Sequence, residues 1–402
     1  MKLSKRIQAC GLSPIRKFHP YAVKAVADGK KIYHLNIGQP DIKTPETYFE
    51  AVRNFSQPVL AYAPSPGIPE MLEAVRNYYE GIGVSLSTDD ILITTGGSEA
   101  LQMLMHCILD EGSEILTAEP FYPNYGMMID MAGGRVVPIP TNPEEGYRYA
   151  DRAKIEARIT DKTRAILVTN PGNPTGVVLT RPEMELLLDV AREHSLYLIC
   201  DEVYREFVYD GEPLSSFAQL PGGEENIVVI DSVSKRFSAC GARIGALISR
   251  NKTLMEAANK LCQARLSVAT LDQVAAAALY GCSSDYFAQV RDEYCKRRDV
   301  CYEGICKIPG AVCTKPDGAF YMMVKLPIRN AEPFQKWLLT EFEDHGETVM
   351  FAPGDGFYAT EGKGLNEVRL AYVLDRKDLT RALELLAMAI EQYKAAGEPI
   401  PE

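Results

Sequence analysis

The sequence lacks a long apolar run and an excess of positive charge. No stretch is apolar over the length that a membrane-spanning helix needs, and the charged N-terminal segment has no apolar core of the kind found in signal peptides, so we expect neither a membrane span nor secretion. The 43 Lys and Arg residues are outnumbered by 54 Asp and Glu residues, which gives a net charge of −11. This balance argues against a nucleic-acid partner, because phosphate binding needs a basic face.

Paired cysteines are also missing, since the ten cysteines are scattered and none forms a C-x-x-C motif. Cys295, Cys301 and Cys306 lie close in sequence, but no matching His or Cys pair accompanies them, so we expect no metal site. Cys200 lies in the apolar run LYLIC, as buried free thiols do. These features predict a cytoplasmic protein with reduced thiols.

The length and the apolar pattern predict two domains. The chain has 402 residues, more than one compact core usually serves. Short β-rich runs alternate with helical patterns, and most runs are continuously apolar, as strands covered on both faces should be. We therefore predict a three-layer α/β/α domain around a mostly parallel seven-stranded sheet. The predicted strands are residues 91–95, 114–119, 135–140, 164–170, 196–202, 226–232 and 242–249.

The pattern changes after about residue 285. A long charged helical segment begins at Asp285, a sheet-like GAFYMMVKL follows at 318–326, and an amphipathic helix is expected over 378–394. This α+β pattern predicts a smaller second domain built from both chain ends. The predicted boundaries are 1–45 for the N-terminal part of the small domain, 46–284 for the large domain and 285–402 for the rest of the small domain.

Three short motifs follow predicted strands, at the carboxyl ends where open α/β sheets bind ligands. TGGSEA at 95–100 is either an anion cradle at a helix N-terminus or an ordinary turn. The prolines and glycines of NPGNPTG build a rigid loop that aims the side chain of Asn173. In DEVY, Asp201 ends an apolar run, where a carboxylate needs a cation or donor unless it caps a helix.

The most informative string is DSVSKRFSACGARIG at 231–245. Ser232, Ser234, Lys235 and Arg243 surround a glycine-containing turn just after a buried strand. A lysine forms a Schiff base when it lies beside a carbonyl and is readily deprotonated. A phosphate nearby would need hydroxyl donors and a bidentate arginine. By composition alone, the same string could be a solvated loop.

This string resembles the S-x-S-K-x-F-S-x-x-G-x-R-x-G signature of the class I/II pyridoxal-phosphate aminotransferases, which share fold type I and include aspartate and aromatic aminotransferases. Further motifs follow in the order of that family, so the resemblance spans nearly the whole chain. They are NIGQPD (36–41), YAPSPGIPE (62–70), TGGSEA, EPFYPNY (119–125), NPGNPTG, DEVY (201–204), PDGAFY (316–321) and EVRLAYV (367–373).

The resemblance implies a role for each matching residue. Lys235 matches the Schiff-base lysine that also moves the substrate proton, and Asp201 matches the residue that keeps the pyridine nitrogen protonated. Tyr204 and Asn173 match the pair that bonds the phenolic oxygen of the cofactor, and Tyr122 matches the aromatic residue stacked on the ring. Lys235, Asp201 and Tyr204 are therefore the predicted catalytic residues.

The resemblance also implies a phosphate cup, a substrate clamp and a homodimer. Arg369 matches the arginine that binds the α-carboxylate of the substrate, helped by Gly38 and Asn173. Tyr62 matches a tyrosine that reaches the phosphate of the other subunit, so the sites would be shared between two copies. The predicted cofactor-binding residues are Tyr62, Gly97, Ser98, Glu99, Tyr122, Asn173, Asp201, Tyr204, Ser232, Ser234, Lys235 and Arg243.

Substrate and reaction type stay open at this point. An aminotransferase acting on aspartate or glutamate, with an acceptor such as 2-oxoglutarate, is the first hypothesis, and aromatic amino acids come second. A C–S lyase or another α-carbon lyase is the alternative reaction, and a non-catalytic regulator is disfavoured. Some aspartate-preferring relatives have Lys directly after Gly-Gly, where this chain has Ser98. The candidates for binding a side-chain carboxylate are then Arg16 and Arg265.

Overall fold

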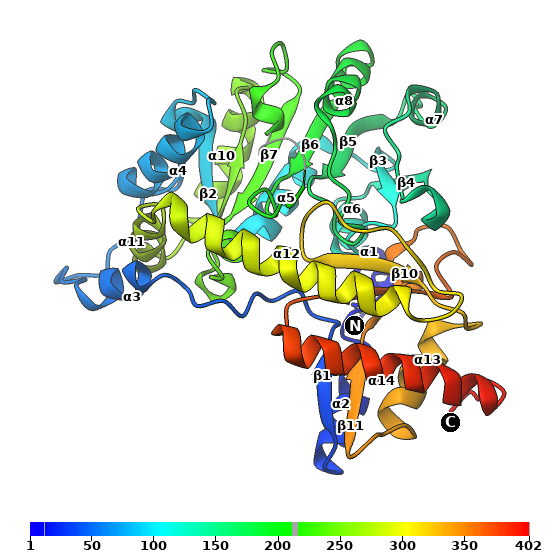
Figure 1. Cartoon of the computed structure of the whole chain (residues 1–402). Helices are drawn as coiled ribbons and strands as arrows, with labels where there is room; N and C mark the ends of the chain where they lie inside the picture. Colours follow the sequence, from blue (N-terminus) through cyan, green and yellow to red (C-terminus); the bar gives the residue numbers. More distant parts are fainter. Residues whose placement is uncertain (12, 211–215, 402) are drawn as a thin grey trace.

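The computed structural model describes residues 1–11, 13–210 and 216–401. A large α/β body occupies the upper part of Figure 1, and a smaller body below it contains both the C-terminal helix and segments from the start of the chain. The long helix α12 (Ser284–Cys306) runs across the region where the two bodies meet. This arrangement brings residues from both ends of the chain to the edge of the large sheet.

A seven-stranded mixed sheet forms the centre of the large body. All of its strands run in the same direction except β8, which is antiparallel to both of its neighbours, β2 and β7. In spatial order the strands are β2 (Ile91–Thr94), β8 (Gly245–Ile248), β7 (Ile227–Ser232), β6 (Tyr197–Asp201), β5 (Thr163–Thr169), β3 (Glu114–Glu119) and β4 (Arg135–Pro140).

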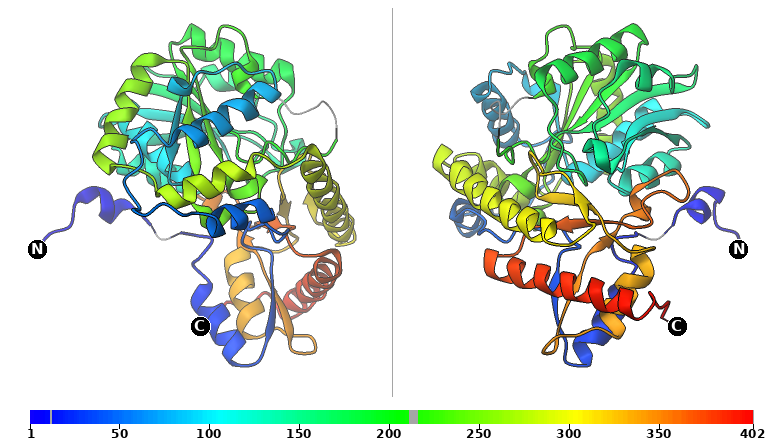
Figure 2. Two further views of the ribbon diagram at one scale, coloured as in Figure 1. Left: turned by 90° about the vertical axis from the view of Figure 1, so that its left-hand side faces the viewer. Right: turned by 45° about the vertical axis from the view of Figure 1, so that its right-hand side comes forward.

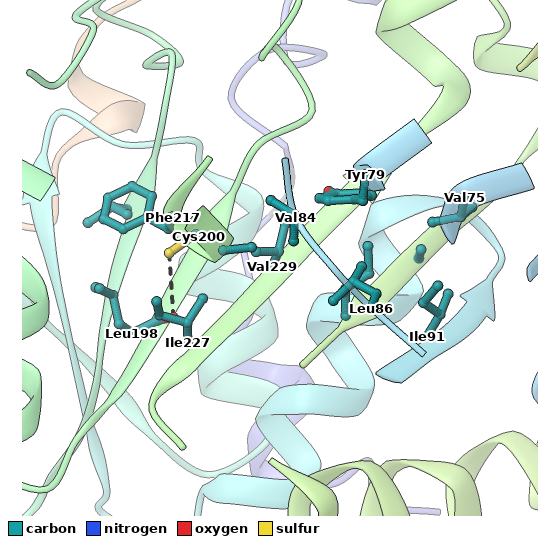
Figure 3. Close-up of a cluster of buried hydrophobic side chains, with 14 of the residues drawn as sticks. Val75, Tyr79, Val84, Leu86, Ile91, Leu198, Cys200, Phe217, Ile227 and Val229 are labelled. Atoms are coloured by element: carbon teal, nitrogen blue, oxygen red, sulfur yellow. Dashed lines mark hydrogen bonds between the residues drawn. The ribbon is translucent and has the colours of Figure 1, made fainter. Parts of the chain in front are cut away.

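Both faces of this sheet are buried, which explains the continuous apolar runs in the sequence. Along β7, Ile227 and Val229 pack into the core on one face (Figure 3), while Val228 and Ile230 pack into the core on the other. The predicted three-layer arrangement with a mostly parallel sheet is confirmed. One face is covered by α4 (Pro69–Gly81), α7 (Arg152–Glu156), α8 (Arg181–Glu193) and α11 (Thr270–Leu279), and the other by α5 (Gly96–Ile108), α6 (Asn124–Met131) and α10 (Lys252–Arg265).

The smaller body combines two small sheets with helices from both chain ends, as predicted. An antiparallel sheet has the order β12 (Ala352–Pro353), β13 (Glu367–Ala371), β10 (Tyr321–Lys325) and β9 (Val312–Cys313). A second pair joins β1 (Lys31–His34) to β11 (Glu347–Met350) in parallel, so the N-terminal segment becomes part of this body. The helices here are α2 (His19–Ala27), α13 (Ala331–Thr340) and α14 (Arg376–Ala395). The boundaries at residues 45 and 284 stay predictions.

The remaining helices contact elements of the large body. Helix α3 (Glu46–Arg53) packs against α11 of the large body. The short helix α1 (Lys5–Ala9) lies on a segment that projects beside the large body in Figure 2 and contacts α6. The single-turn helix α9 (Val233–Arg236) continues directly from β7. Among the described residues, none of the helices combines the length and the apolar character that crossing a bilayer requires.

Candidate active site

A cavity of about 800 Å³ opens at the carboxyl ends of β6 and β7, where residues of the small body approach the large sheet. This is the edge at which parallel sheets bind ligands. Among the described residues, four cationic side chains line it, against the single carboxylate of Asp201. The cavity therefore favours anionic ligands. The four cations are Arg16, Lys235, Arg243 and Arg369.

Asp201 ends β6 and is buried at the base of the cavity. Its Oδ2 accepts a hydrogen bond from the Tyr125 hydroxyl, and its Oδ1 accepts one from the Val203 amide at 3.3 Å. No ion pair joins Asp201 to a cation in the described part of the chain. Burial raises the pKa of this carboxyl to about 6, because the ionised form has lost its water without gaining a positive partner.

Lys235 is held in the single turn of α9, which begins where β7 ends. The Ser232 hydroxyl accepts a hydrogen bond from the Ser234 amide and so caps this turn. The Lys235 ammonium donates to the Gly38 carbonyl oxygen at 2.8 Å, and its Nζ lies 3.7 Å from the Cys240 sulfur. No carboxylate of the described residues pairs with this lysine, which leaves its amine available to a carbonyl ligand.

Backbone amides and hydroxyl groups line the part of the cavity next to the N-terminus of α5. Gly97 and Ser98 lie in the first turn of α5, whose N–H groups and dipole attract anions. The Ser232 and Ser234 hydroxyl oxygens lie 2.8 Å apart, and both residues line the cavity. Close approach of two backbones builds this cradle, since a Cβ at Gly245 would lie 2.5 Å from the Gly96 carbonyl carbon.

Arg243 completes this cationic end of the cavity. Its backbone is left-handed, with φ of 53°, a conformation that a non-glycine residue rarely adopts. One guanidinium nitrogen donates to the Cys240 carbonyl at 3.0 Å and another to the Thr95 carbonyl at 3.5 Å, and the residue as a whole is exposed. The predicted residues Gly97, Ser98, Ser232, Ser234 and Arg243 are thus brought together around one cavity.

The opposite wall carries a buried arginine that has no anionic partner. Arg369, on β13, is only 2% exposed. It donates to Asn173 Oδ1 at 3.0 Å and to the Asn36 carbonyl at 2.7 Å, while its buried Nε has no hydrogen-bond partner. No carboxylate of the described residues forms an ion pair with it. A buried cation with neutral partners alone is suited to bind the carboxylate of a ligand.

Aromatic hydroxyls connect this wall to the centre of the cavity. Asn173 Nδ2 donates to the Tyr204 hydroxyl at 3.3 Å, and the Tyr204 and Tyr321 hydroxyl oxygens lie 3.0 Å apart. Burial raises the pKa of Tyr204 well above its usual range, so this phenol stays protonated. Tyr122 also lines the cavity, with its ring edge-on to Tyr125 at 5.4 Å.

Several residues that line the cavity were not predicted from the sequence, and three of them have polar side chains that contact predicted site residues: Tyr125, Cys240 and Tyr321. All three lie inside motifs that the sequence displays, EPFYPNY, DSVSKRFSACGARIG and PDGAFY. The signal was therefore present in the motifs. Their roles depend on which residue each side chain meets across the fold, and the sequence does not give those distances.

Two predicted residues lie elsewhere. Glu99 is absent from the cavity lining; its carboxylate accepts a hydrogen bond from the Thr95 amide and pairs with Arg265 at 3.0 Å. Arg265 also donates to the Ser65 carbonyl, so both terminal nitrogens of its guanidinium have hydrogen-bond partners. Tyr62 is 82% exposed and does not line the cavity of its own chain.

The two arginine candidates for a second carboxylate therefore differ. Arg16 lines the cavity, and its guanidinium makes no hydrogen bond or ion pair to any described residue. It lies close enough to Tyr122 to lower the pKa of that phenol, although burial dominates and the pKa of Tyr122 is raised overall. Arg265 is bound to Glu99 and lies outside the lining.

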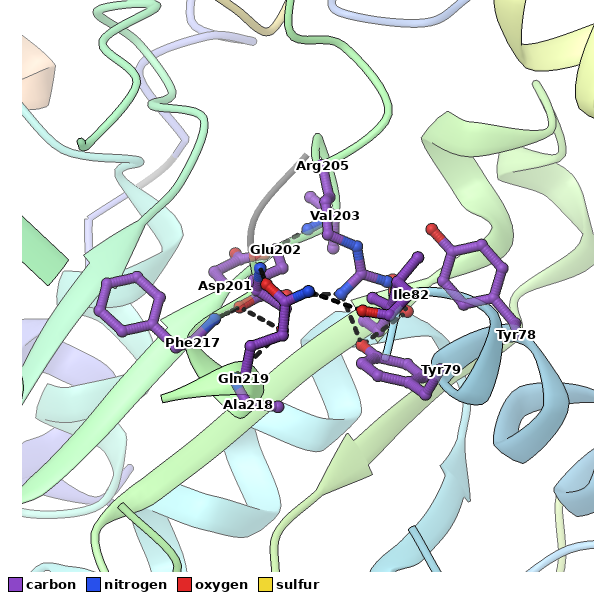
Figure 4. Close-up of polar contacts among 12 residues, drawn as sticks. Tyr78, Tyr79, Ile82, Asp201, Glu202, Val203, Arg205, Phe217, Ala218 and Gln219 are labelled. Atoms are coloured by element: carbon purple, nitrogen blue, oxygen red, sulfur yellow. Dashed lines mark hydrogen bonds and ion pairs between the residues drawn. The ribbon is translucent and has the colours of Figure 1, made fainter. Parts of the chain in front are cut away.

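A buried cluster of charges lies directly behind the cavity. Asp231 accepts two hydrogen bonds from Arg236, at 2.7 and 2.9 Å, and one from the Tyr79 hydroxyl at 3.0 Å. Arg205 forms ion pairs with both Asp231 and Glu202. Figure 4 shows its contacts with Glu202 and with the Tyr79 hydroxyl. Burial alone would raise the pKa of Asp231, but the two arginines outweigh it and lower the pKa.

The residues present fit pyridoxal phosphate, the cofactor implied by the sequence resemblance. Asp201 is the deciding observation, because a buried carboxylate that has only neutral donors lacks the positive partner that a protonated pyridine nitrogen supplies. Lys235 would hold the aldehyde, and the serines, the α5 N-terminus and Arg243 would hold the phosphate. No group of three or more His, Cys, Asp or Glu side chains within the described ranges is placed to hold a metal ion.

Comparison with known proteins identifies the relatives of the chain. The sequence matches the family described as aminotransferase class I and II over residues 30–386. A probable aspartate/prephenate aminotransferase from Thermus aquaticus is 32% identical over 394 residues, which cover 97% of this chain and 99% of that protein. Aromatic-amino-acid aminotransferase 2 from Thermococcus litoralis is 30% identical over 402 residues, covering 98% of this chain and 100% of that protein.

A solved structure has the same fold. Aspartate aminotransferase from Thermus thermophilus with maleate superposes with a TM-score of 0.86 at 31% sequence identity, and the match covers 97% of this chain and 100% of that chain. The shared fold therefore extends over both bodies of the molecule.

The raised pKa of Asp201 predicts a specific pH dependence. Between its usual value of 3.8 and about 6, the unfolded chain ionises this group before the folded protein does, so the folded state loses stability as the pH rises. Asp201→Asn removes this loss. From pH 4 to pH 8, the free energy of unfolding of the cofactor-free variant, relative to that of the unsubstituted protein, should rise by about 2.5 kcal/mol.

Urea denaturation of both cofactor-free proteins at pH 4 and pH 8 measures this difference. The matched control is Asp292→Asn, which removes an exposed carboxylate paired with Lys296. It should follow the pH profile of the unsubstituted protein. A parallel profile for Asp201→Asn as well would contradict the raised pKa.

Proposed function

Because the chain belongs to the class I and II aminotransferases, which are pyridoxal-phosphate enzymes, we propose that its amino donor is a dicarboxylic amino acid, aspartate or glutamate. The acceptor in this proposal is a 2-oxo acid such as 2-oxoglutarate. The relatives that it matches are named as aminotransferases, so the lyase alternative is not favoured. Aromatic amino acids remain the second candidate, since one relative is named for them.

The positive charge of the cavity is the single observation that best supports a dicarboxylic substrate. Lys235 is needed for the aldehyde, Arg243 for the phosphate and Arg369 for the α-carboxylate of the substrate. Arg16 is the remaining lining cation among the described residues, and no side-chain partner neutralises it. A second carboxylate on the substrate would pair with it. The maleate bound to the Thermus thermophilus enzyme is likewise a dicarboxylate.

Beside Lys235 and the phosphate cradle, three side chains of this chain act on the ring of the cofactor in this proposal. Bound here, pyridoxal phosphate supplies a reactive carbonyl and a ring that takes up the electrons of the broken Cα–H bond. Asp201 holds a proton on the ring nitrogen through a buried charged contact. The Tyr204 hydroxyl donates a hydrogen bond to the phenolic oxygen of the cofactor. Tyr122 covers one face of the ring.

Lys235 and Arg369 act on the substrate. Arg369 binds the α-carboxylate with two parallel N–H donors, which fixes the substrate in one orientation. The Lys235 amine then removes the proton from the substrate α-carbon and delivers it to the carbon that was the aldehyde carbon of the cofactor. The Gly38 carbonyl, 2.8 Å from Nζ, is placed to accept a hydrogen bond from the amine and to orient it.

A homodimer with shared active sites is part of the proposal, supported by an exposed apolar surface beside Tyr62. Val59 is 70% exposed, Leu60 65% and Tyr62 82%, while Leu266 nearby is 52% exposed. The Thr270 hydroxyl donates to the Ala61 carbonyl, so the two segments lie side by side. A second copy covering this surface would bring Tyr62 to the phosphate of its partner.

We also propose that the protein works in the cytoplasm. Among the described residues, all ten cysteines are free thiols. Free thiols throughout the chain are typical of a reducing compartment.

The assignment of Lys235 predicts a covalent label. The purified protein should be yellow, and borohydride should attach the cofactor to the peptide that contains Lys235, as peptide mass spectrometry would show. Lys235→Ala should bind the cofactor without linking to it and lose at least about 1,000-fold in transamination, because both the anchor and the proton carrier are gone. The exposed Lys252→Ala is the control. A label on any other lysine would refute the assignment.

Arg16 and Arg265 provide a matched test of the substrate. Mixing the holoenzyme with single amino acids and following the absorbance of the cofactor gives the rate of the first half-reaction for each donor. Arg16→Ala should slow aspartate or glutamate by about 10- to 100-fold, the value of one charged hydrogen-bonded contact, and spare neutral donors. Arg265→Ala should leave this selectivity unchanged, because that guanidinium binds Glu99. If aromatic donors react faster than aspartate and glutamate in the unsubstituted enzyme, the second candidate substrate is correct.

The shared active site predicts complementation between two inactive variants. Tyr62→Ala and Lys235→Ala, unfolded together and refolded as a mixture, should recover about a quarter of the normal activity, because half of the dimers are mixed and each has one intact site. Each variant refolded alone is the control. Sedimentation at the working dilution should show a dimer. A monomer with full activity would exclude the shared site.

A further inference from the structure

Tyr321 touches both the predicted cofactor side and the predicted substrate side of the cavity. It is the first residue of β10 and is 2% exposed. Its hydroxyl oxygen lies 3.0 Å from that of Tyr204, and the guanidinium carbon of Arg369 lies 4.4 Å above its ring centre. Gly38 leaves it no spare room, because a Cβ there would lie 1.8 Å from the Tyr321 hydroxyl oxygen.

Hydrogen-bond donors and acceptors leave two possible directions for the Tyr204 proton, toward Tyr321 or into the cavity. Arg369 can only donate, so the atom of Asn173 that it contacts must be the amide oxygen. The amide nitrogen of Asn173 then faces Tyr204 and donates to its hydroxyl oxygen. Tyr204 has one acceptor position and one proton left. If the Tyr321 hydroxyl donates to that position, the Tyr204 proton points into the cavity.

The ring of Tyr321 supports Arg369 in a separate way. The guanidinium stacks over the Tyr321 ring, and the Phe357 ring centre lies 5.0 Å from the same carbon. Two aromatic faces and two hydrogen bonds, to Asn173 and Asn36, thus hold the plane of the guanidinium. Bidentate binding of a carboxylate needs this plane to be fixed.

We propose that Tyr321 is a positioning residue with two separable parts. Its hydroxyl aims the Tyr204 proton at the phenolic oxygen of the cofactor, and its ring holds Arg369 flat for the α-carboxylate of the substrate. The inference rests on the proposed function, since it places the cofactor in this cavity. Simple core packing against Phe320, whose ring centre is 4.9 Å away, is the competing explanation, and it predicts that loss of the hydroxyl has no effect.

Two substitutions of the holoenzyme separate the parts. Tyr321→Phe keeps the ring and removes the hydroxyl, whereas Tyr321→Leu removes both. The absorbance of the lysine-linked cofactor, titrated with pH, reports the donor at the phenolic oxygen, because losing a donor disfavours the deprotonated form of the linkage. Tyr321→Phe should raise the apparent pKa of this titration by about half a pH unit or more while changing KM less than about twofold.

Tyr321→Leu should show a similar spectroscopic shift and, in addition, raise KM for the amino donor about tenfold or more, as expected for a disordered carboxylate clamp. Tyr372→Phe is the matched control, because it removes a buried hydroxyl that donates to the Ala319 carbonyl at 3.3 Å and does not line the cavity. It should titrate like the unsubstituted enzyme.

Each outcome decides between the explanations. If the unsubstituted enzyme shows no pH-dependent absorbance of a lysine-linked cofactor, the proposed function fails. If it does and Tyr321→Phe titrates identically, the positioning role of the hydroxyl is wrong and packing explains the residue. If both variants have the same KM, the role of the ring is wrong. Because Tyr321→Phe preserves the packing volume, the hydroxyl is tested even if Tyr321→Leu does not fold.

Discussion

The geometry of the cavity depends on a buried ionic cluster behind it, in which Arg205 and Arg236 share Asp231 and Arg205 also binds Glu202. Breaking a buried ion pair by removing one partner costs about 3–5 kcal/mol, because the other charge is left buried and uncompensated. The cluster is therefore stable only when all of its members are in place. Its members are direct chain neighbours of cavity residues: Glu202 of Asp201, Asp231 of Ser232, and Arg236 of Lys235.

The cluster also contributes to the electrostatics of the cavity. Burial is the largest cause of the raised pKa of Asp201; the hydrogen bonds from Tyr125 and Val203 lower this pKa, and the negative charges of Asp231 and Glu202 raise it further. A site that holds protons this strongly would also favour the protonated form of a ring nitrogen placed beside Asp201. The cations on the other walls lack carboxylate partners within the described residues, so Asp201 is the single negative group in a cavity lined by positive side chains. An anionic cofactor and an anionic substrate complement this distribution.

Much of the fold and of the candidate site could be predicted because the signals are local. Continuous apolar runs gave the strands of the large sheet, and the motifs after them gave the residues that line the cavity, Lys235 and Asp201 among them. The reversed direction of β8 has no local signal, because strand direction depends on the connection and not on composition. The pairing of Glu99 with Arg265 also has no local signal in the sequence, since the two residues are 166 positions apart. The position of Tyr321 could not be predicted for the same reason, because it depends on contacts with Tyr204 and Arg369 across the fold.

The N-terminal segment contacts both Arg369 and Lys235, and it also contains Arg16, the cation proposed to bind a second carboxylate of the substrate. Asn36 accepts a hydrogen bond from Arg369, and Gly38 accepts one from Lys235, both through backbone carbonyls. The side chains of this segment are less constrained, and Arg16 is one of them. Gly38 is fixed by its close contact with Tyr321, but Arg16 takes no part in these hydrogen bonds and can change without disturbing them. Substrate preference could therefore change here, at positions such as Arg16, while the sheet that carries Lys235 and Asp201 stays the same.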